Sequence, residues 1–110
     1  MRMWMLPPEN MCRKHLLGEH VEMHMLVGTL RKGISTQGYV DNGLVELDKI
    51  QERHDALVAE MLLRGYNHNS PLPEIPPIVG DVGVVDRQEN LLEICRRCPD
   101  CRLLNMQVVA

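Results

Sequence analysis

The sequence has no hydrophobic run that approaches the length needed to cross a membrane, which is about 20 consecutive apolar residues. Its opening segment, MRMWMLPPEN, also lacks the apolar run of a secretory signal. We therefore expect no membrane partner, a cytoplasmic location and a first residue that remains in place. Four cysteines in a chain without such a signal are expected to be thiols or metal ligands rather than disulfides.

Internal repeats are missing, and so is the alternation of apolar and polar residues that marks a strand. The 110 residues suffice for one domain. Hydrophobic residues make up 45% and charged residues 25%, which is the balance of an ordinary globular protein. The sequence thus predicts an all-α fold, a single compact domain over residues 1–110 with about three helices and long loops. We expect a monomer.

The chain lacks the excess of positive charge that favours a nucleic-acid partner, because its formal net charge is −3. The charge is unevenly distributed, however. Residues 1–32 hold five lysines and arginines against three acidic residues, whereas residues 33–110 hold seven against twelve. A locally positive surface near the N-terminus can still receive phosphate, although its long-range attraction for DNA would be weak.

The first helix is predicted from about Glu9 to Lys32, with Pro7 and Pro8 ahead of or within its opening turn. Helical spacing gives it one apolar stripe, which we expect to face the core: Cys12, Leu16, Met23, Val27 and Leu30. Glu22 lies on the edge of this stripe. A carboxylate placed there can face a cleft.

A second helix is predicted after the connection GISTQGYVDNG, with Asp41 or Asn42 as its cap and Gly65 as its end. The proline-containing segment YNHNSPLPEIPPIVGDVG then predicts a long loop. The sequence DRQE, starting at Asp86, has the form of a capping box and predicts a short third helix. No pattern assigns a structure to the tail rich in cysteine and arginine, residues 95–110.

The stretch HLLGEHVEMHMLVGTLRKG carries three histidines. For each histidine taken singly, a solvated or core-edge imidazole with a structural hydrogen bond explains its presence as well as a functional role does. His20 and His24 share a face at a spacing that suits zinc, but the glutamate between them is one place later than in the metalloprotease pattern. The order His20-Val21-Glu22 also has the H-x-E form of zinc deaminases, whose proline and cysteine pattern and strands are lacking here.

Three cysteines form C-x-x-C-x-x-C at Cys95, Cys98 and Cys101. They could hold a metal if Cys12 or a histidine completed the set. The simpler interpretation, a tail of reduced thiols, is favoured, and we expect no metal site and no cofactor.

The amino terminus is a candidate nucleophile. A free α-amine has a reference pKa of about 7.7–8.0, well below that of lysine, so part of it is unprotonated at neutral pH. Such an amine can attack an aldehyde carbon and form a Schiff base. We expect Met1 to be retained because the bulky Arg2 disfavours its removal, and Glu22 is a candidate for moving the protons.

Two segments, HLLGEHVEMHMLVGTLRKG and RHDALVAEMLLRGYNHNSPL, resemble the pyrimidine-dimer DNA glycosylases and AP lyases of the phage endonuclease V type and their bacterial relatives. The opening MRMWMLPPENMCRKHLLGEH is similar to the bacterial branch in particular. The likeness is strongest over residues 1–72, where both helices match in order with the same glycine stop.

This resemblance implies a small helical DNA-repair enzyme that acts without a metal on double-stranded DNA containing a damaged or abasic site. It makes Met1 the nucleophile that attacks C1′ of the damaged nucleotide, and Glu22 the group that moves protons around the imine. β-Elimination of the 3′ phosphate then nicks the strand. The residues expected to bind DNA are Arg2, His15, His24, Arg31, Lys32 and His68.

The sequence departs from the family pattern at Val21 and Met25, where arginines are usual, and it lacks the aromatic-rich C-terminal segment of the phage enzyme. Each missing arginine removes a phosphate contact. We therefore expect cleavage at abasic sites to survive better than recognition of a pyrimidine dimer. The alternative is a non-catalytic helical module that binds DNA or a protein, and that holds a metal through its C-terminal cysteines.

Overall fold

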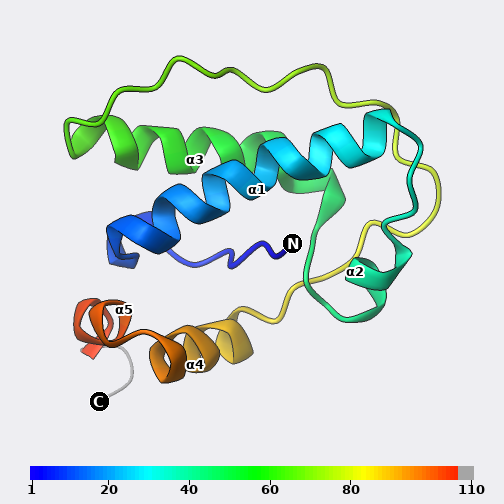
Figure 1. Ribbon diagram of the computed structural model, residues 1–110. Helices are drawn as coiled ribbons and strands as arrows, with labels where there is room; N and C mark the ends of the chain where they lie inside the picture. Colours follow the sequence, from blue (N-terminus) through cyan, green and yellow to red (C-terminus); the bar gives the residue numbers. More distant parts are fainter. Residues whose placement is uncertain (107–110) are drawn as a thin grey trace.

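The computed structural model describes residues 1–106, and these residues form helices and loops without any strand. The all-α prediction is confirmed. In chain order the elements are the 3₁₀ helix η1 (Pro8–Asn10), α1 (Arg13–Arg31), α2 (Gln37–Asp41), the 3₁₀ helix η2 (Leu47–Lys49), α3 (Ile50–Leu63), α4 (Arg87–Arg97) and α5 (Pro99–Leu104) (Figure 1). The three predicted helices correspond to α1, α3 and α4. None of the described helices is long and apolar enough to span a bilayer.

Helix α1 begins four residues later than predicted. Pro8 opens η1 and Pro7 precedes it, and η1 ends where Met11 adopts an extended conformation. Cys12 then caps α1, because its sulfur accepts a hydrogen bond from the backbone N–H of His15. A proline-started turn and a helix start have the same sequence signature, and cysteine is not among the usual capping residues.

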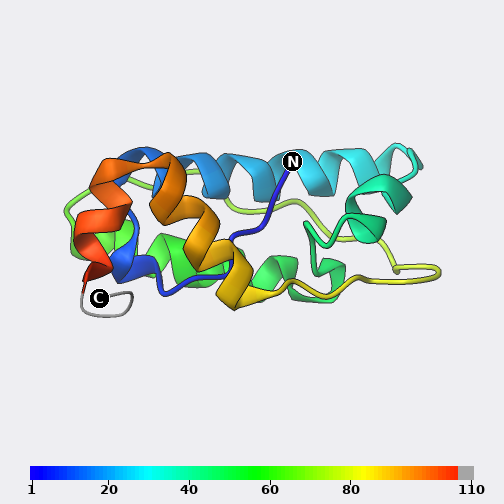
Figure 2. The same cartoon turned by 90° about the horizontal axis from the view of Figure 1, so that it is seen from below.

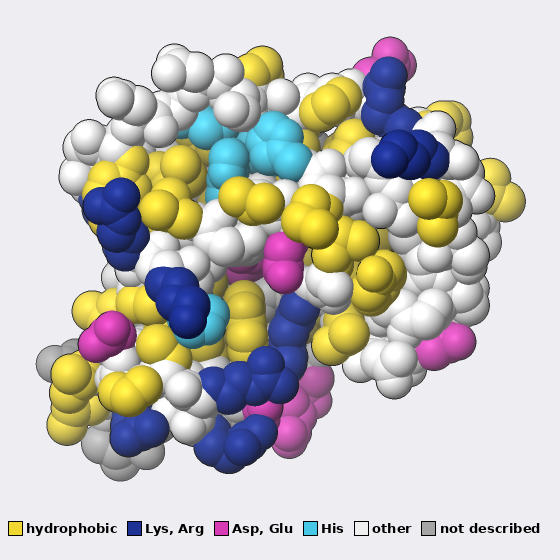
Figure 3. All heavy atoms as spheres, viewed as in Figure 1, with side chains coloured by type: hydrophobic (Ala, Val, Ile, Leu, Met, Phe, Trp, Pro, Cys, Tyr) yellow, Lys and Arg dark blue, Asp and Glu magenta, His cyan; other side chains and the backbone are white. Residues whose placement is uncertain are grey.

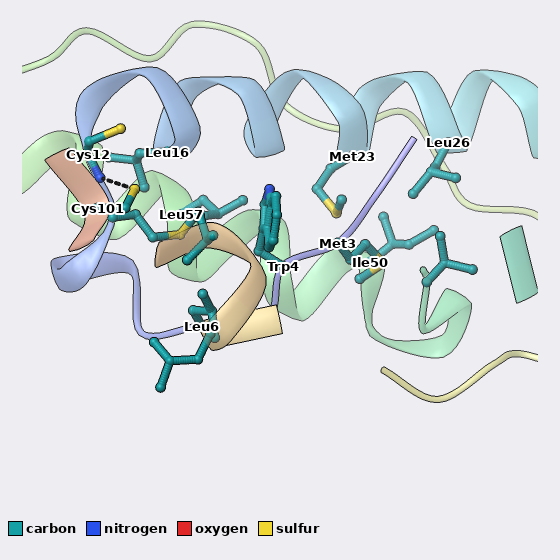
Figure 4. Close-up of a cluster of buried hydrophobic side chains, with 14 of the residues drawn as sticks. Met3, Trp4, Leu6, Cys12, Leu16, Met23, Leu26, Ile50, Leu57 and Cys101 are labelled. Carbon is teal, nitrogen blue, oxygen red and sulfur yellow. Dashed lines mark hydrogen bonds between the residues drawn. The ribbon is translucent and has the colours of Figure 1, made fainter. Parts of the chain in front are cut away.

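Helices α1 and α3 lie side by side and form the core with the N-terminal segment, residues 1–12 (Figures 1 and 2). This segment passes between the α1–α3 pair and α4, and its residues Met3, Trp4 and Leu6 are buried (Figure 4). The predicted core stripe of α1 is confirmed at four positions, whereas Leu30 is half-buried. The chain start is therefore part of the core.

The predicted cap of the second helix is wrong. Asp41 ends the short helix α2, and the Asn42 side chain bonds back to the carbonyl of Gly38 at 2.7 Å. Asparagine favours helix caps and turns alike, so this position was ambiguous from sequence. Helix α3 starts only at Ile50 and ends as predicted, since Gly65 follows its cap with a left-handed φ of 82°.

The C-terminal helices follow the long loop. Asp86 caps α4 as predicted by accepting from the N–H of Glu89 at 3.0 Å. Cys98 separates α4 from α5, and the amide of Asn105 donates to the carbonyl of Asn10 at 2.9 Å. The tail is thereby fastened to the N-terminal segment. Residues 107–110, the end of the tail to which no pattern gave a structure, lie outside the described residues.

A buried ion pair joins α1, α3 and the N-terminal segment. The guanidinium of Arg53 donates to both carboxylate oxygens of Glu19, at 2.6 and 2.9 Å, and to the carbonyl of Leu6 at 2.7 Å. Both charged side chains are almost fully excluded from solvent. A pair of this kind is costly to break, because removing one member leaves the other charge buried and uncompensated.

We expect Glu19→Gln to lower the free energy of unfolding by about 3–5 kcal/mol in urea denaturation, because it leaves the Arg53 guanidinium without a counter-charge. The matched control is Glu60→Gln, which removes the partly exposed pair with Arg64 on α3. That change should cost about 1 kcal/mol or less. Equal losses in the two variants would contradict the role given to the buried pair.

Candidate active site

The chain start is held against α1 and α4 by main-chain hydrogen bonds. The N–H of Arg2 donates to Oε2 of Glu22 at 3.1 Å. The side-chain amide of Asn90 on α4 donates to the carbonyls of Met3 and Trp4 at 3.2 and 2.9 Å. These contacts fix the backbone of the first residues, so the amino terminus is directed to the Glu22 side of α1.

Glu22 is half-buried on α1 beside the amino terminus. Burial raises the pKa of its carboxyl, while the hydrogen bond from Arg2 and the positive charge of the Met1 amine act in the opposite direction. A carboxyl whose pKa is raised from its ordinary value toward neutrality is better suited to exchange protons at physiological pH. The structure therefore places a carboxyl with a raised pKa beside the amino terminus.

The Arg2 side chain turns toward α4. Its Nη2 donates to Oδ1 of Asn90 at 2.7 Å, and its guanidinium carbon lies 4.1 Å from the centre of the Trp4 ring. Burial lowers the pKa of Arg2, and the neighbouring charge of Arg97 lowers it further, although an arginine remains protonated in this setting. The side chain is thus a fixed positive charge next to the amine and the carboxyl.

Arg31 and Lys32, which the sequence also predicts to bind DNA, lie apart from this centre. Arg31 is nine residues beyond Glu22, which corresponds to about 13 Å along the helix axis. Its Nη1 donates to the carbonyl of Glu74 at 2.9 Å, and both side chains are exposed. Val21 and Met25, where the resemblance leads one to expect arginines, are about half exposed on either side of Glu22.

His24 and His68 belong to a group of four imidazoles, with His20 from the same helix and His54 from α3. Five pairs of ring centroids in this group lie 4.8 to 5.3 Å apart. In each ring Nε2 is buried and has no hydrogen-bond partner. Burial, reinforced by the other three rings, lowers the pKa of His20 to about 4, so this imidazole is neutral at physiological pH.

His15 lies in a second group with Cys12, Cys98 and Cys101. Cys95, which the sequence pattern grouped with the other C-terminal cysteines, is not a member. It is buried on α4, and its carbonyl accepts a hydrogen bond from Arg102 at 2.8 Å. Cys95 lies three residues before Cys98, but α4 ends between them and Cys98 is in an extended conformation that leads into α5. The regular spacing of the three cysteines therefore does not bring Cys95 into the group.

The histidine group and the basic side chains of α4 occupy different parts of one face. In Figure 3 most of the visible histidine atoms form one group over α1 and α3, and several lysine and arginine side chains lie over α4, with others at the edges of this face. An acidic side chain lies in the hollow between these two groups. The positive charge closest to the chain start therefore comes partly from α4, with Arg97 lying 6.0 Å from the Trp4 ring.

Sequence reasoning missed Asn90, His54 and the pairing of Cys12 with His15. Asn90 gave no signal, because its role depends on the chain start lying against α4. The repeated spacing Cys12-x-x-His15 and Cys98-x-x-Cys101 was present and could have indicated one shared site. His54 comes close to His20 only through the packing of α1 against α3.

The family model described as pyrimidine dimer DNA glycosylase matches residues 1–74. The matched segment contains the N-terminal segment, α1, α2 and α3, and it ends within the long loop. No curated protein and no solved structure matches the chain significantly.

We expect Asn90→Ala to loosen the chain start, because it removes three hydrogen bonds made to the first four residues. The free energy of unfolding should fall by about 1–3 kcal/mol, and the amide protons of Arg2 and Met3 should exchange faster by NMR. Gln88→Ala, an exposed change on the same helix, is the control. Unchanged exchange at these two amides would mean that Asn90 does not hold the segment.

Proposed function

Because this chain belongs to the pyrimidine dimer DNA glycosylase family, we propose that it excises damaged bases from double-stranded DNA and cleaves the abasic site with the Met1 amine and Glu22. The observation that carries this proposal is the hydrogen bond from the Arg2 N–H to Glu22, next to the amine. An N-terminal amine can act as a nucleophile only if the segment that carries it is held in position. Here that segment is buried at Met3, Trp4 and Leu6.

The proposed reaction begins when the Met1 nitrogen attacks C1′ of the damaged nucleotide. A C1′–N bond forms to the protein while the bond to the base breaks, and the base leaves with the electron pair and takes up a proton. The sugar ring opens to an imine between C1′ and Met1. Loss of a proton from C2′ then expels the 3′ phosphate, and water releases the sugar fragment from the amine.

Glu22 is proposed to carry protons between these steps. Its raised pKa supports a role in which the carboxyl is protonated in part of the cycle and ionised in another part. At an abasic site the base is already missing, so only imine formation and elimination are required. Abasic DNA is therefore the proposed preferred substrate, and excision at a pyrimidine dimer is the more demanding reaction.

Phosphate binding is proposed for Arg2, Arg31 and Lys32. Arg2 is held by Asn90 and Trp4 beside the amine, which supports contact with the lesion strand. Arg31 and Lys32 are exposed and would contact the backbone farther along the duplex. DNA contact by His15, His24 and His68 has less support, because one nitrogen of each ring lies within 4.8 Å of donor atoms of other side chains.

Borohydride reduction should trap the protein covalently on a duplex that contains one abasic site, because the imine is reduced to a stable amine. Intact mass followed by peptide mapping should assign the adduct to the Met1 nitrogen. Protein with an acetylated terminus should give no adduct, while an undamaged duplex of the same sequence is the control for the DNA. An adduct that maps to a lysine would reject the N-terminal nucleophile.

We expect Glu22→Gln to lower single-turnover cleavage of abasic DNA by about 10²–10⁴-fold, which is the usual contribution of a proton-transfer group. DNA affinity should be retained, since the glutamine carbonyl can still accept from the Arg2 N–H. Glu9→Gln, an exposed change in η1, serves as the control. Cleavage at the wild-type rate in Glu22→Gln would remove Glu22 from the mechanism.

A further inference from the structure

Three thiols and one imidazole meet where the start of α1 faces the junction of α4 and α5, and we propose that they bind one structural zinc ion. The Sγ atoms of Cys12 and Cys98 are 3.8 Å apart. Nδ1 of His15 lies 3.2 Å from Sγ of Cys12 and 3.6 Å from Sγ of Cys101. All four donor atoms lie within 4.8 Å of one another.

These distances agree with a tetrahedral zinc site. Zinc binds thiolate at about 2.3 Å and imidazole at about 2.0–2.1 Å, which separates two sulfur ligands by about 3.8 Å and a sulfur from a nitrogen by about 3.5 Å. A disulfide would instead need sulfurs about 2.05 Å apart, and all three thiols are free. One shared cation explains the arrangement of all four groups, whereas a disulfide would leave one thiol and the imidazole unexplained.

The sulfurs are also oriented by the backbone. Cys12 accepts from the N–H of His15 at 3.5 Å, Cys98 from the N–H of Cys101 at 3.4 Å, and Cys101 from the N–H of Cys12 at 3.3 Å. Figure 4 draws the last of these bonds. Each sulfur therefore has a backbone donor, and such bonds stabilise a metal-bound thiolate and fix its direction.

Four protein ligands leave no open position for substrate, so the role of this ion is structural. It would fasten the start of α1 to α5 and, through α5, to α4. Because α4 carries Asn90, the same ion would help to hold the chain start. The family match ends at residue 74, whereas two of the four ligands lie beyond that segment.

The full-length protein, purified with a thiol reductant, should contain this zinc by elemental analysis and native mass spectrometry. Cobalt exchanged into the protein should give the intense thiolate-to-cobalt charge-transfer bands of a sulfur-rich tetrahedral site. Cys98→Ser should lose one zinc per chain and most of these bands. Cys95→Ser removes a buried cysteine outside the group and should keep both.

The wild-type measurement decides the proposal even if Cys98→Ser does not fold. Folded wild-type protein whose cobalt form lacks thiolate bands would overturn it. Equal loss of zinc in Cys95→Ser and Cys98→Ser would overturn it as well, because the structure separates these two cysteines.

A different donor set supports a second site, and we infer that His20, His24, His54 and His68 bind a second zinc ion. Their four Nε2 atoms are buried without hydrogen-bond partners. A buried nitrogen without a partner is costly. One ring nitrogen of each histidine lies within 4.8 Å of those of the other three, so one cation could bind all four rings. Imidazole ligands suit zinc, copper, nickel and iron.

The environment of His54 supports this assignment. Its Nδ1 lies 3.1 Å from Oδ1 of Asp55, and a carboxylate on the far nitrogen is the usual partner of a metal-bound histidine. All five histidines of the chain belong to one of the two groups. This site would tie the loop at His68 to both long helices, and it competes with the DNA contacts expected for His24 and His68.

Zinc content again supplies the test. Wild-type protein should hold two zinc ions per chain, and His68→Gln should hold one while keeping the thiolate-to-cobalt bands. His68 lies in a loop, and Asn69→Ala, an exposed change next to it, is the matched control that should keep both ions. A single zinc in wild-type protein that is unchanged by His68→Gln would overturn the second site, as would loss of that zinc in both loop variants.

Discussion

The hydrogen bond from the backbone N–H of Arg2 to Glu22 is the constraint on which the proposed chemistry depends. It can form only because the next residues are part of the core. Met3 and Trp4 are buried and held by Asn90, and the carbonyl of Leu6 accepts from Arg53. The ion pair of Arg53 with Glu19 joins this support to α1 and α3. A flexible chain start would not hold the Met1 amine in one position. The proposed chemistry therefore needs the buried segment as much as it needs the Glu22 carboxylate.

Helix α1 explains why one stretch carries three histidines and two glutamates. These side chains face four parts of the molecule. Glu19 faces Arg53 in the core, Glu22 faces the chain start and His15 faces the C-terminal cysteines. His20 and His24 both face α3. The polar residues are consequently directed inward by specific partners. A solvent-exposed helix face would not need this combination.

The sequence was sufficient for features that depend on neighbouring residues. The helical class, the end of α3 at Gly65 and the cap of α4 at Asp86 follow from local backbone chemistry. The late start of α1 was not predictable, because a cysteine cap differs from the usual pattern. The roles of His54, Asn90 and Cys12 depend on contacts between residues far apart in the chain. A single sequence does not show which of these distant residues meet. Glu22 was a candidate partner of the N-terminal amine from its place at the edge of the apolar stripe, and the family resemblance then singled it out.

The position of Asn90 divides the support of the chain start between two parts of the chain. The segment that identifies the family ends at residue 74 and already includes Met1 and Glu22. Yet the amide that clamps the first residues comes from α4, beyond that boundary. The proposed nucleophile is therefore held in part by a side chain from outside the segment that shows the family.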